Sequence, residues 1–405
     1  MRIRSVTLGT DVGYPLDDER FQTFEAFQRQ ARNRFADGGL EVQTVRLATQ
    51  PFPSVLANEG PEAAPDFAQA LEAQCQAHGI DYCSVGPVIA TDSRSALSYI
   101  AAIPEIIRRT DVAFASVLVA EPEAGINLDA VAASARAVAE IAGSTPDGFG
   151  NLRLAVLANC EPGSPFFPVS YHGGGETSFS IATEAADLAV EAFSGPGSLR
   201  DASEELTGAI EETARLIEGI ADGLAADFGF EYGGIDFSLA PFPETERSLG
   251  HAIEKLGVEA FGGSGTLFTV AFIKRAIEAA RFERCGFSGV MLPVLEDKTL
   301  ADRSVEHSFD LDSLLLYSTV CGTGLDTIPL PGDVSVEELS GVLLDVATLS
   351  LVADKPLTAR LMPIPGKSVG EMTDFDFEYF ANARVLDAPG RGAPRIFERG
   401  ARWFW

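Results

Sequence analysis

One cysteine of the chain has the surroundings that a reactive thiol requires. Cys321 lies in the stretch YSTVCGTGLDTIPLPGD, where Gly322 and Gly324 follow it and the carboxylate of Asp326 comes five residues later. A nucleophilic or radical-bearing thiol needs access for a substrate and an activating base, and glycine lets the backbone approach a ligand closely. We therefore predict that Cys321 is a nucleophile or an acid–base group. The structural alternative is a small buried residue in a tight turn.

A histidine and a glutamate flank three consecutive glycines in the stretch YHGGGE. The glycines allow the chain to fold back, so that His172 and Glu176 can point to one place and exchange protons or bind a metal. Their exposed backbone N–H groups are also possible donors to an oxyanion. The structural alternative is a tight loop in which the histidine caps a helix.

Carboxylates follow two apolar stretches that have the character of buried strands. Asp236 and Ser238 end GIDFSL, and Glu296 and Asp297 end VMLPVLED. Ligands of α/β sheets bind where strands end, and neighbouring carboxylates raise each other's proton affinity. We predict site carboxylates at both places, with Asp236 and Ser238 binding substrate. The alternatives are a turn-forming aspartate and a helix N-cap.

An arginine and a possible metal complete the candidate site. Arg360 lies on the expected strand TARLM, where it would anchor a carboxylate or phosphate, or neutralise buried acids. The cofactor is open, and the alternative of a bound divalent metal includes Ca, Mg, Zn and Fe. Its candidate ligands are His172, Glu176, Asp236 and Asp297.

Strand-like and helix-like stretches alternate along the chain. We expect strands at residues 3–9, 41–48, 81–87, 113–119, 152–158, 234–239, 289–294 and 358–362. We expect helices at residues 17–36, 67–78, 95–109, 128–142, 183–193, 199–228, 266–284, 311–319 and 335–353. Repeated units of this kind predict a parallel or mostly parallel sheet covered by helices.

The composition excludes several classes of protein. The net charge is −29 and the first lysine is Lys255, so a nucleic-acid or anionic-membrane partner is not expected. No apolar run is long enough to span a membrane, and the first residues turn acidic, unlike a secretory signal. We expect a cytoplasmic protein. The five cysteines form no C-x-x-C pair, which argues against zinc-ribbon and thioredoxin-type sites.

Several segments together resemble one protein family. They are NLRLAVLANCEPGSPFFPVSYHGGGETSFSI, YGGIDFSLAPFP, VMLPVLED, YSTVCGTGLDTIPLPGD and TARLMPIPGK. Their order and spacing resemble the DUF711 family, also called UPF0210. The resemblance implies an α/β barrel related to pyruvate formate-lyase and other glycyl radical enzymes. In that fold two parallel five-stranded halves pack together, helices lie outside, and an inner loop, here that of Cys321, lies inside.

The resemblance and the residues lead to one functional expectation. Residues 1–388 form a single barrel domain and residues 389–405 an extension. The protein is an enzyme that acts on a small polar carboxylate-bearing metabolite, as a non-radical lyase, isomerase or hydrolase. The alternatives are a non-catalytic metabolite-binding or regulatory protein, and a radical enzyme; the chain lacks the C-terminal glycine segment of glycyl radical enzymes. We also expect a homo-oligomer.

Overall fold

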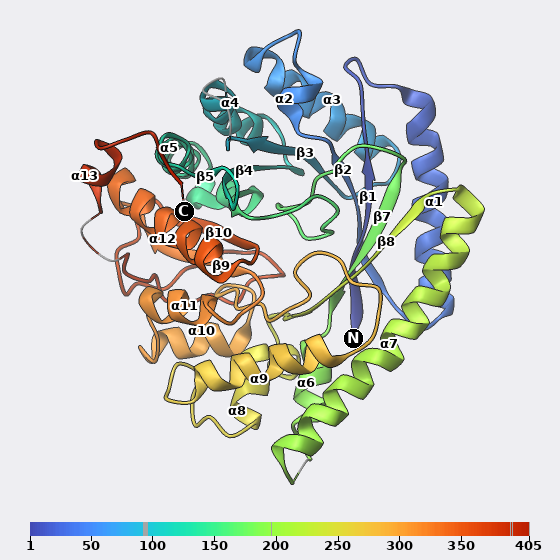
Figure 1. Cartoon of the computed structure of the whole chain (residues 1–405), viewed down its shortest axis with the longest axis vertical. Coiled ribbons are helices and arrows are strands. Elements are labelled where there is room, and N and C mark those ends of the chain that lie inside the picture. Colours follow the sequence, from blue (N-terminus) through green and yellow to red (C-terminus); the bar gives the residue numbers. More distant parts are fainter. Residues whose placement is uncertain (92–95, 196, 389, 391, 405) are drawn as a thin grey trace.

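One mixed sheet of eleven strands lies at the centre of the molecule, and helices surround it (Figure 1). The computed structural model describes residues 1–91, 96–195, 197–388, 390 and 392–404. Along the sheet the order is β8-β7-β1-β2-β3-β4-β6-β10-β9, with β5 and β11 attached beside β4. The expected α/β class is confirmed.

The strands form two sets that run in opposite directions. Parallel neighbours in the first set are β1 (Arg2–Thr10), β2 (Val42–Thr49), β3 (Tyr82–Ile89), β4 (Ala113–Glu121) and β6 (Leu154–Ala158). The second set contains two parallel pairs, β7 (Ser178–Glu184) with β8 (Glu231–Ala240), and β9 (Gly324–Pro331) with β10 (Leu357–Ile364). The sets meet antiparallel at β1–β7 and at β6–β10.

Thirteen α-helices are assigned within the described residues. They are α1 (Asp18–Asp37), α2 (Phe52–Val55), α3 (Ala64–Ala77), α4 (Ala96–Arg109), α5 (Leu128–Ser144), α6 (Ala186–Ala192), α7 (Leu199–Phe228), α8 (Leu249–Lys255), α9 (Thr266–Ala279), α10 (Lys298–Val305), α11 (Leu311–Ser318), α12 (Val336–Ala353) and α13 (Pro394–Phe397). None of the helices in these ranges is both long and apolar enough to cross a membrane.

Local sequence explains the long helices that pack on the sheet. In α1, Phe21, Phe24 and Phe27 recur at helical spacing and are buried, while Asp17 caps the first turn by accepting the Glu19 N–H at 3.0 Å. The longest helix, α7, begins at the cap Ser198 and ends at Gly229, whose φ of 68° is a left-handed conformation that glycine adopts without strain. The predicted boundaries of these two helices are confirmed to within one residue.

The two ends of the sheet, β8 and β9, do not pair with each other. The segment of residues 283–296 runs between them without regular structure. On one side the Ile235 N–H donates to the Glu283 carbonyl at 2.8 Å. On the other side the Val294 N–H donates to the Asp326 carbonyl at 3.2 Å. The strand predicted at 289–294 is therefore wrong; the chain there is extended but makes one isolated bridge, from Pro293 to Asp326.

Two other segments differ from the prediction. Residues 178–184 form β7, so the helix expected from residue 183 begins only at Ala186. Residues 324–331, read as a glycine-rich loop, form the buried strand β9. Pro329 and Pro331 have no N–H, but β9 has a regular strand neighbour on one side only, at β10, so few ladder bonds are missing.

The connection from β6 to β7 crosses the inner side of the sheet. We call residues 159–177 the inner segment. The hydroxyl of Thr7 on β1 donates to the Pro165 carbonyl at 3.2 Å, and the hydroxyl of Ser84 on β3 donates to the Ser170 carbonyl at 2.9 Å. These bonds satisfy carbonyl groups that would otherwise be buried without partners. The inner segment, and not the loop at Cys321, is thereby fixed against several strands.

The C-terminal residues return to the sheet. The short β11 (Arg402–Trp403) pairs antiparallel with β5 (Gly125–Asn127), so the extension packs on the body of this chain (Figure 1). Trp403 and Phe404 are 59% and 61% exposed. Part of the predicted extension, at residues 389, 391 and 405, lies outside the described residues.

Asp297 joins two helices at their first turns. It is fully buried and accepts hydrogen bonds from the Leu249 and Gly250 N–H groups of α8, and from the Thr299 and Leu300 N–H groups of α10. The Ser248 hydroxyl donates a further bond at 2.5 Å. Its carboxylate is fully used in capping, which agrees with the alternative of a helix N-cap and leaves no oxygen for a metal.

Replacement of this carboxylate should therefore destabilise the fold. Asp297→Ala leaves the N–H groups of Leu249, Gly250 and Leu300 without acceptors, and we expect a loss of about 2–4 kcal/mol in the free energy of unfolding. Urea unfolding followed by circular dichroism measures it. The control Asp302→Ala, which removes an exposed ion pair with Lys298 on the same α10, should change the value by less than about 0.5 kcal/mol. Equal effects would contradict the capping role.

Candidate functional site

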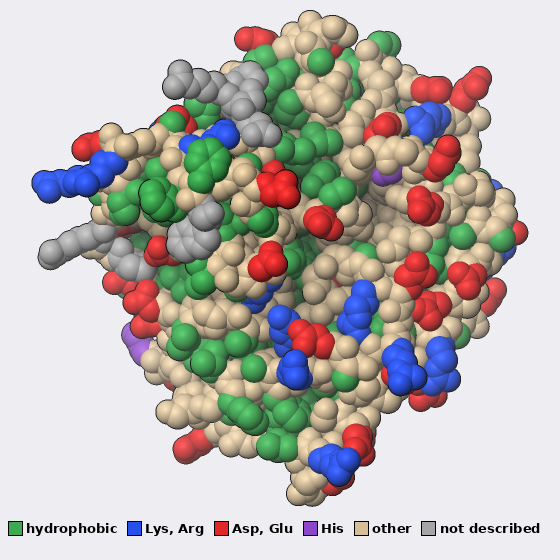
Figure 2. All heavy atoms as spheres, in the orientation of Figure 1, with side chains coloured by type: hydrophobic (Ala, Val, Ile, Leu, Met, Phe, Trp, Pro, Cys, Tyr) green, Lys and Arg blue, Asp and Glu red, His purple; other side chains and the backbone are tan. Residues whose placement is uncertain are grey.

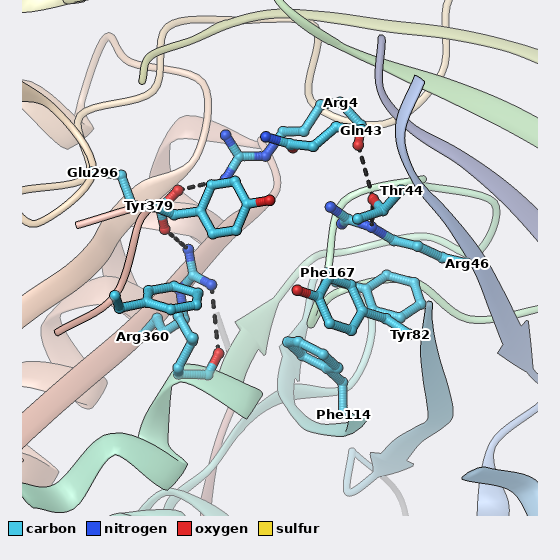
Figure 3. Close-up of a pocket in the computed structure, with 12 residues that line it drawn as sticks. Arg4, Gln43, Thr44, Arg46, Tyr82, Phe114, Phe167, Glu296, Arg360 and Tyr379 are labelled. Atoms are coloured by element: carbon cyan, nitrogen blue, oxygen red, sulfur yellow. Dashed lines mark hydrogen bonds and ion pairs between the residues drawn. The ribbon is translucent and has the colours of Figure 1, made fainter. Parts of the chain in front are cut away.

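A small cavity lies inside the molecule between the first and second sets of strands (Figure 3). Its volume is about 60 Å³. The lining side chains are arginines, aromatic rings and a few polar groups: Arg4, Gln43, Thr44, Arg46, Tyr82, Phe114, Leu152, Phe167, Glu296, Arg360, Phe377 and Tyr379. Three buried or half-buried arginines in a chain of net charge −29 form an unusual concentration of positive charge.

Strand starts and strand ends meet at this cavity. Arg4 lies near the beginning of β1, and Tyr82 is the first residue of β3. Arg360 comes from the middle of β10, and Glu296 ends the irregular segment beside β9. Because the two strand sets run in opposite directions, the amino ends of the first set face the carboxyl-terminal part of the second. Tyr379 closes the cavity from the chain that follows β10.

Arg4, Glu296, Arg360 and Asp326 form a continuous buried ion-pair chain. The two oxygens of Glu296 are divided between the arginines: Arg4 donates to Oε2, and Arg360 Nη2 donates to Oε1 at 2.7 Å (Figure 3). Arg360 Nε also donates to Asp326 Oδ1 at 2.6 Å. The side chains of Glu296, Arg360 and Asp326 are 5%, 4% and 1% exposed, so little water screens them.

The two carboxylates of this chain have pKa shifts of opposite sign. Burial alone would raise the pKa of Glu296, but the attraction of Arg4 and Arg360 outweighs it, and the net pKa is lowered. For Asp326, burial raises the pKa, Arg360 lowers it, and the negative charge of Glu296 raises it further. The net pKa of Asp326 is raised because it faces one arginine and Glu296 faces two.

A β-bulge directs Asp326 towards Arg360. The register between β9 and β10 shifts at this point: Leu325 pairs with Ala359, but Ile328 pairs with Leu361. Two residues of β9, Asp326 and Thr327, thus face one residue of β10. Thr327 has a φ of 44°, a left-handed conformation that is costly for a β-branched residue. Bulges and strained residues of this kind occur next to functional sites.

Arg46 differs from the other two arginines because it has no carboxylate partner within the described residues. Its Nε donates to the Thr44 hydroxyl at 2.8 Å, and its guanidinium lies 5.6 Å from the Tyr82 ring centroid and 5.2 Å from that of Phe167. The residue is 7% exposed. Burial and then the positive charge of Arg4 lower the pKa of Arg46 to about 10. Its outer N–H groups therefore lack an anion.

Cys321 does not line this cavity. Its side chain is 1% exposed and packs in the main hydrophobic core, where its sulfur accepts the Gly324 N–H at 3.3 Å. The Gly322 N–H donates to the Val290 carbonyl at 2.8 Å, and Gly324 has a φ of 97° beside the backbone of Thr358. The glycines thus serve close backbone packing. The geometry corresponds to the structural alternative, a small residue in a tight turn.

His172 and Glu176 lie at the opposite edge of the sheet, near the carboxyl end of β1. His172 is buried, and its Nε2 lies 3.9 Å from Asp11 Oδ1, beyond hydrogen-bond distance. Glu176 is exposed. The three glycines between them also remain exposed to solvent. The structure therefore does not bring this pair together with the arginine cavity.

Asp236 and Ser238 hold a turn together. The Asp236 carboxylate accepts the Ser238 hydroxyl at 2.5 Å and the N–H groups of Phe287 and Ser288, both at 2.9 Å. Burial raises the pKa of Asp236, and these hydrogen bonds oppose the shift. With Glu176 exposed and the Asp236 and Asp297 oxygens already bonded, the predicted metal ligands are not gathered. Within the described ranges, no three His, Cys, Asp or Glu side chains could hold one ion.

A larger cavity of about 890 Å³ lies at the opposite edge, around the amino ends of β7 and β8. Ser164 and Val169 of the inner segment line it, whereas Phe167 lines the arginine cavity. The inner segment therefore forms a wall between the two spaces. The acidic side chains of the larger cavity are exposed, and its Lys274 is 3.5 Å from Glu278. We place the candidate site in the smaller cavity because its buried charges require a partner.

Sequence reasoning identified three of the seven charged or phenolic residues of this site. Glu296, Asp326 and Arg360 were predicted and lie in direct contact. Arg4, Arg46 and the two tyrosines were missed. One signal was available: Arg46 in TVRLAT repeats the pattern of an arginine inside a buried strand that singled out Arg360. Arg4, close to the chain start, and Tyr379, in an irregular segment, carried no such signal.

The ion-pair chain predicts an acid-dependent loss of stability. A lowered folded-state pKa means that the contribution of Glu296 is fully present above the ordinary carboxyl pKa of about 4.3 and disappears as pH falls through the folded value. Glu296→Gln should cost about 3–5 kcal/mol in unfolding free energy at pH 7. The difference from the unmodified protein should shrink below pH 4. Denaturant titrations across pH test this.

The exposed pair of Arg200 and Glu204 provides the control. Glu204→Gln should change the unfolding free energy by less than about 0.5 kcal/mol at every pH. A Glu296→Gln difference that grows on acidification would contradict the assigned sign.

Comparison with known proteins agrees with the resemblance found in the sequence. The family described as Uncharacterised ACR (DUF711) matches residues 1–378. A UPF0210 protein of Methanopyrus kandleri is 32% identical over 389 residues, which cover 90% of this chain and 83% of the relative. UPF0210 proteins of Desulforudis audaxviator and Desulfovibrio desulfuricans are 30% and 29% identical over the same shares. The chain belongs to the DUF711 family, also called UPF0210.

Proposed function

We propose that the protein is an enzyme that binds a small carboxylate-bearing metabolite in the arginine cavity and transforms it there without radical chemistry. The observation that carries the proposal is the guanidinium of Arg46, which faces the cavity and has no carboxylate partner among the described residues. A buried charge without a partner costs several kcal/mol. A bound anion would remove that cost, because an arginine fork matches two carboxylate oxygens.

The field inside the cavity supports an anion in spite of the acidic surface. Acidic side chains are spread over the face shown in Figure 2, and they repel anions at long range. Solvent and salt screen these exposed charges within about 10 Å, whereas charges inside the cavity are screened much less. The local arginines therefore decide what binds, and the surface only slows the encounter.

Two phenol groups are placed to act on the bound molecule. The hydroxyls of Tyr82 and Tyr379 point towards the space between Arg46 and Arg360 (Figure 3). Burial, and then a hydrogen bond with Glu378, raise the pKa of Tyr379 to about 12, so it remains a proton donor at neutral pH. Tyrosine hydroxyls can donate a hydrogen bond or a proton to an oxygen that becomes negative during reaction. Glu296, held by two arginines, is a positioning residue.

We also propose the finer fold that the family resemblance implies. The first set contributes five parallel strands. The second set contributes four, and residues 289–296 would complete it as a fifth, since they hydrogen-bond towards both β8 and β9. The inner segment would then be the internal loop of a pyruvate formate-lyase-like barrel, in place of the loop at Cys321.

Arg46 provides the test of anion binding. Sodium propionate and sodium phosphate are compared with sodium chloride at equal ionic strength, by thermal unfolding and by calorimetric titration. A bound anion at a hundredfold excess over its Kd should stabilise the protein by about 3 kcal/mol. Arg46→Met should remove this effect, while unfolding free energy without anion stays equal or rises because a buried unpaired charge is gone.

The matched control is Arg384→Met, since Arg384 is also buried but donates to the Ser304 carbonyl away from the cavity. It should lose stability and retain the anion effect. Anion stabilisation that survives in Arg46→Met would overturn the site. Binding with no consumption of any small carboxylate, followed by NMR, would favour the non-catalytic binding protein.

A Cys321→Ala variant distinguishes this proposal from the sequence-based hypothesis of a catalytic cysteine. Cys321→Ala should retain turnover, since the thiol lines neither cavity and packs in the core. The hypothesis of a nucleophilic Cys321 predicts complete loss. The comparison variant is Cys75→Ala, which removes another fully buried thiol. If Cys321→Ala is folded and loses turnover while Cys75→Ala does not, Cys321 takes part in catalysis.

A further inference from the structure

The charges around the cavity leave room for one negative charge. Of the three arginines that line the cavity, Arg4 pairs with Glu296, Arg360 pairs with Glu296 and Asp326, and Arg46 pairs with no carboxylate among the described residues. One positive charge remains, and it belongs to Arg46 because the other two arginines are already paired. A second anionic group would lie close to Glu296 in a space with little water, where like charges repel strongly.

Most polar groups of the lining are already used. The Thr44 hydroxyl donates to the Arg4 carbonyl at 2.8 Å and accepts from Arg46 Nε. Gln43 donates to Glu184 at 3.3 Å, and both oxygens of Glu296 are bonded. What remains within the described residues is the outer edge of the Arg46 guanidinium and the hydroxyls of Tyr82 and Tyr379, of which the second also interacts with Glu378. A ligand with several hydroxyl groups would lose water without gaining partners.

The rest of the wall is apolar and aromatic. Phe114 packs edge-to-face on Tyr82 and on Phe167, with ring centroids 5.4 and 5.2 Å apart. Phe377 and Tyr379 form a further pair at 5.1 Å, and Leu152 lies nearby. Together these rings give the cavity wall a surface suited to CH₂ and CH₃ groups, and Tyr82 and Phe167 lie directly against the Arg46 guanidinium.

The volume limits the length of the ligand. An apolar cavity of about 150 Å³ just admits benzene. The arginine cavity, at about 60 Å³ and open on one side, offers less than half of that space within its walls. It has room for a carboxylate with a short chain, or for a few water molecules when empty.

We infer that the substrate is a short-chain monocarboxylate of about two to four carbon atoms, with an apolar chain end and at most one further oxygen. This inference rests on the proposed function and narrows its substrate class. Arg46 holds the carboxylate, the aromatic rings enclose the chain, and Tyr82 meets the additional oxygen. Glu296 determines charge specificity, because its negative charge rejects a dianion while it holds Arg4 and Arg360 in place.

Calorimetric titration of the full chain with a set of sodium salts tests the inference. The probes are acetate, propionate and butyrate as monocarboxylates, malonate and succinate as dianions, benzoate for size, and phosphate, all at matched ionic strength. Propionate should bind at least about tenfold more tightly than malonate, which has a similar length. Benzoate should bind more weakly than propionate because its ring exceeds the cavity.

The same titrations on the Glu296→Gln variant provide a second test. Removing the negative charge should reduce the preference for propionate over malonate by about tenfold. Because this variant can lose its fold, the salt series on the unmodified protein is sufficient alone. If malonate, succinate or phosphate binds more tightly than propionate and Arg46→Met abolishes that binding, the substrate is not a monocarboxylate. The anion site at Arg46 would still stand. Absence of any Arg46-dependent binding would overturn the proposed function itself.

Discussion

The contact on which the site depends is the double ion pair of Arg360. From the middle of β10 it reaches Asp326 of the neighbouring β9 and Glu296 of the irregular segment. Glu296 then reaches Arg4 on β1, in the other strand set. The ion pairs of Arg360 and Glu296 thus connect β9 and β10, at one end of the sheet, to β1 through the irregular segment. Removing one partner would leave the remaining buried charges uncompensated, so a substitution at any of these residues should destabilise the whole ion-pair chain.

The cavity and the surface have opposite electrostatics for a physical reason. A surface of net charge −29 is tolerable because water and salt screen exposed charges. Charges in the cavity are screened much less, so desolvation destabilises an arginine there unless an anion pairs with it. Arg4 and Arg360 have theirs within the chain. Arg46 has no carboxylate partner among the described residues, and under the proposed function a bound anion would supply that charge.

The secondary structure was predictable wherever periodicity was strong. Residues 18–37 and 199–228 bury aromatic or aliphatic side chains at helical spacing, and their caps are visible in the sequence. Prediction failed where tertiary contacts overrode local preference. Residues 324–331 form a strand despite two prolines because a single partner, β10, suffices. Residues 289–294 have a strand-like composition, yet no continuous ladder forms with either neighbour.

The predicted site carboxylates likewise show what local sequence can predict and what tertiary contacts decide. Asp236, Glu296 and Asp297 look alike in sequence, as acids in or at the end of apolar runs, whereas Asp326 follows the glycines at Cys321. In the folded protein, Asp236 and Asp297 accept hydrogen bonds from backbone N–H groups, whereas Glu296 and Asp326 form ion pairs with arginines. Which of these occurs depends on what packs against each strand end, and that partner comes from dozens or hundreds of residues away.

The sequence by itself determined the family and the α/β class, and it singled out Glu296, Asp326 and Arg360, which the fold brings into contact. Those follow from local patterns and from the rarity of charges in buried strands. Only the tertiary structure decided that Cys321 belongs to the core and that Arg46 faces a cavity. A glycine-rich loop looks the same whether its glycines admit a ligand or another backbone. A buried arginine is distinguished by whether a carboxylate reaches it, which chain folding alone determines.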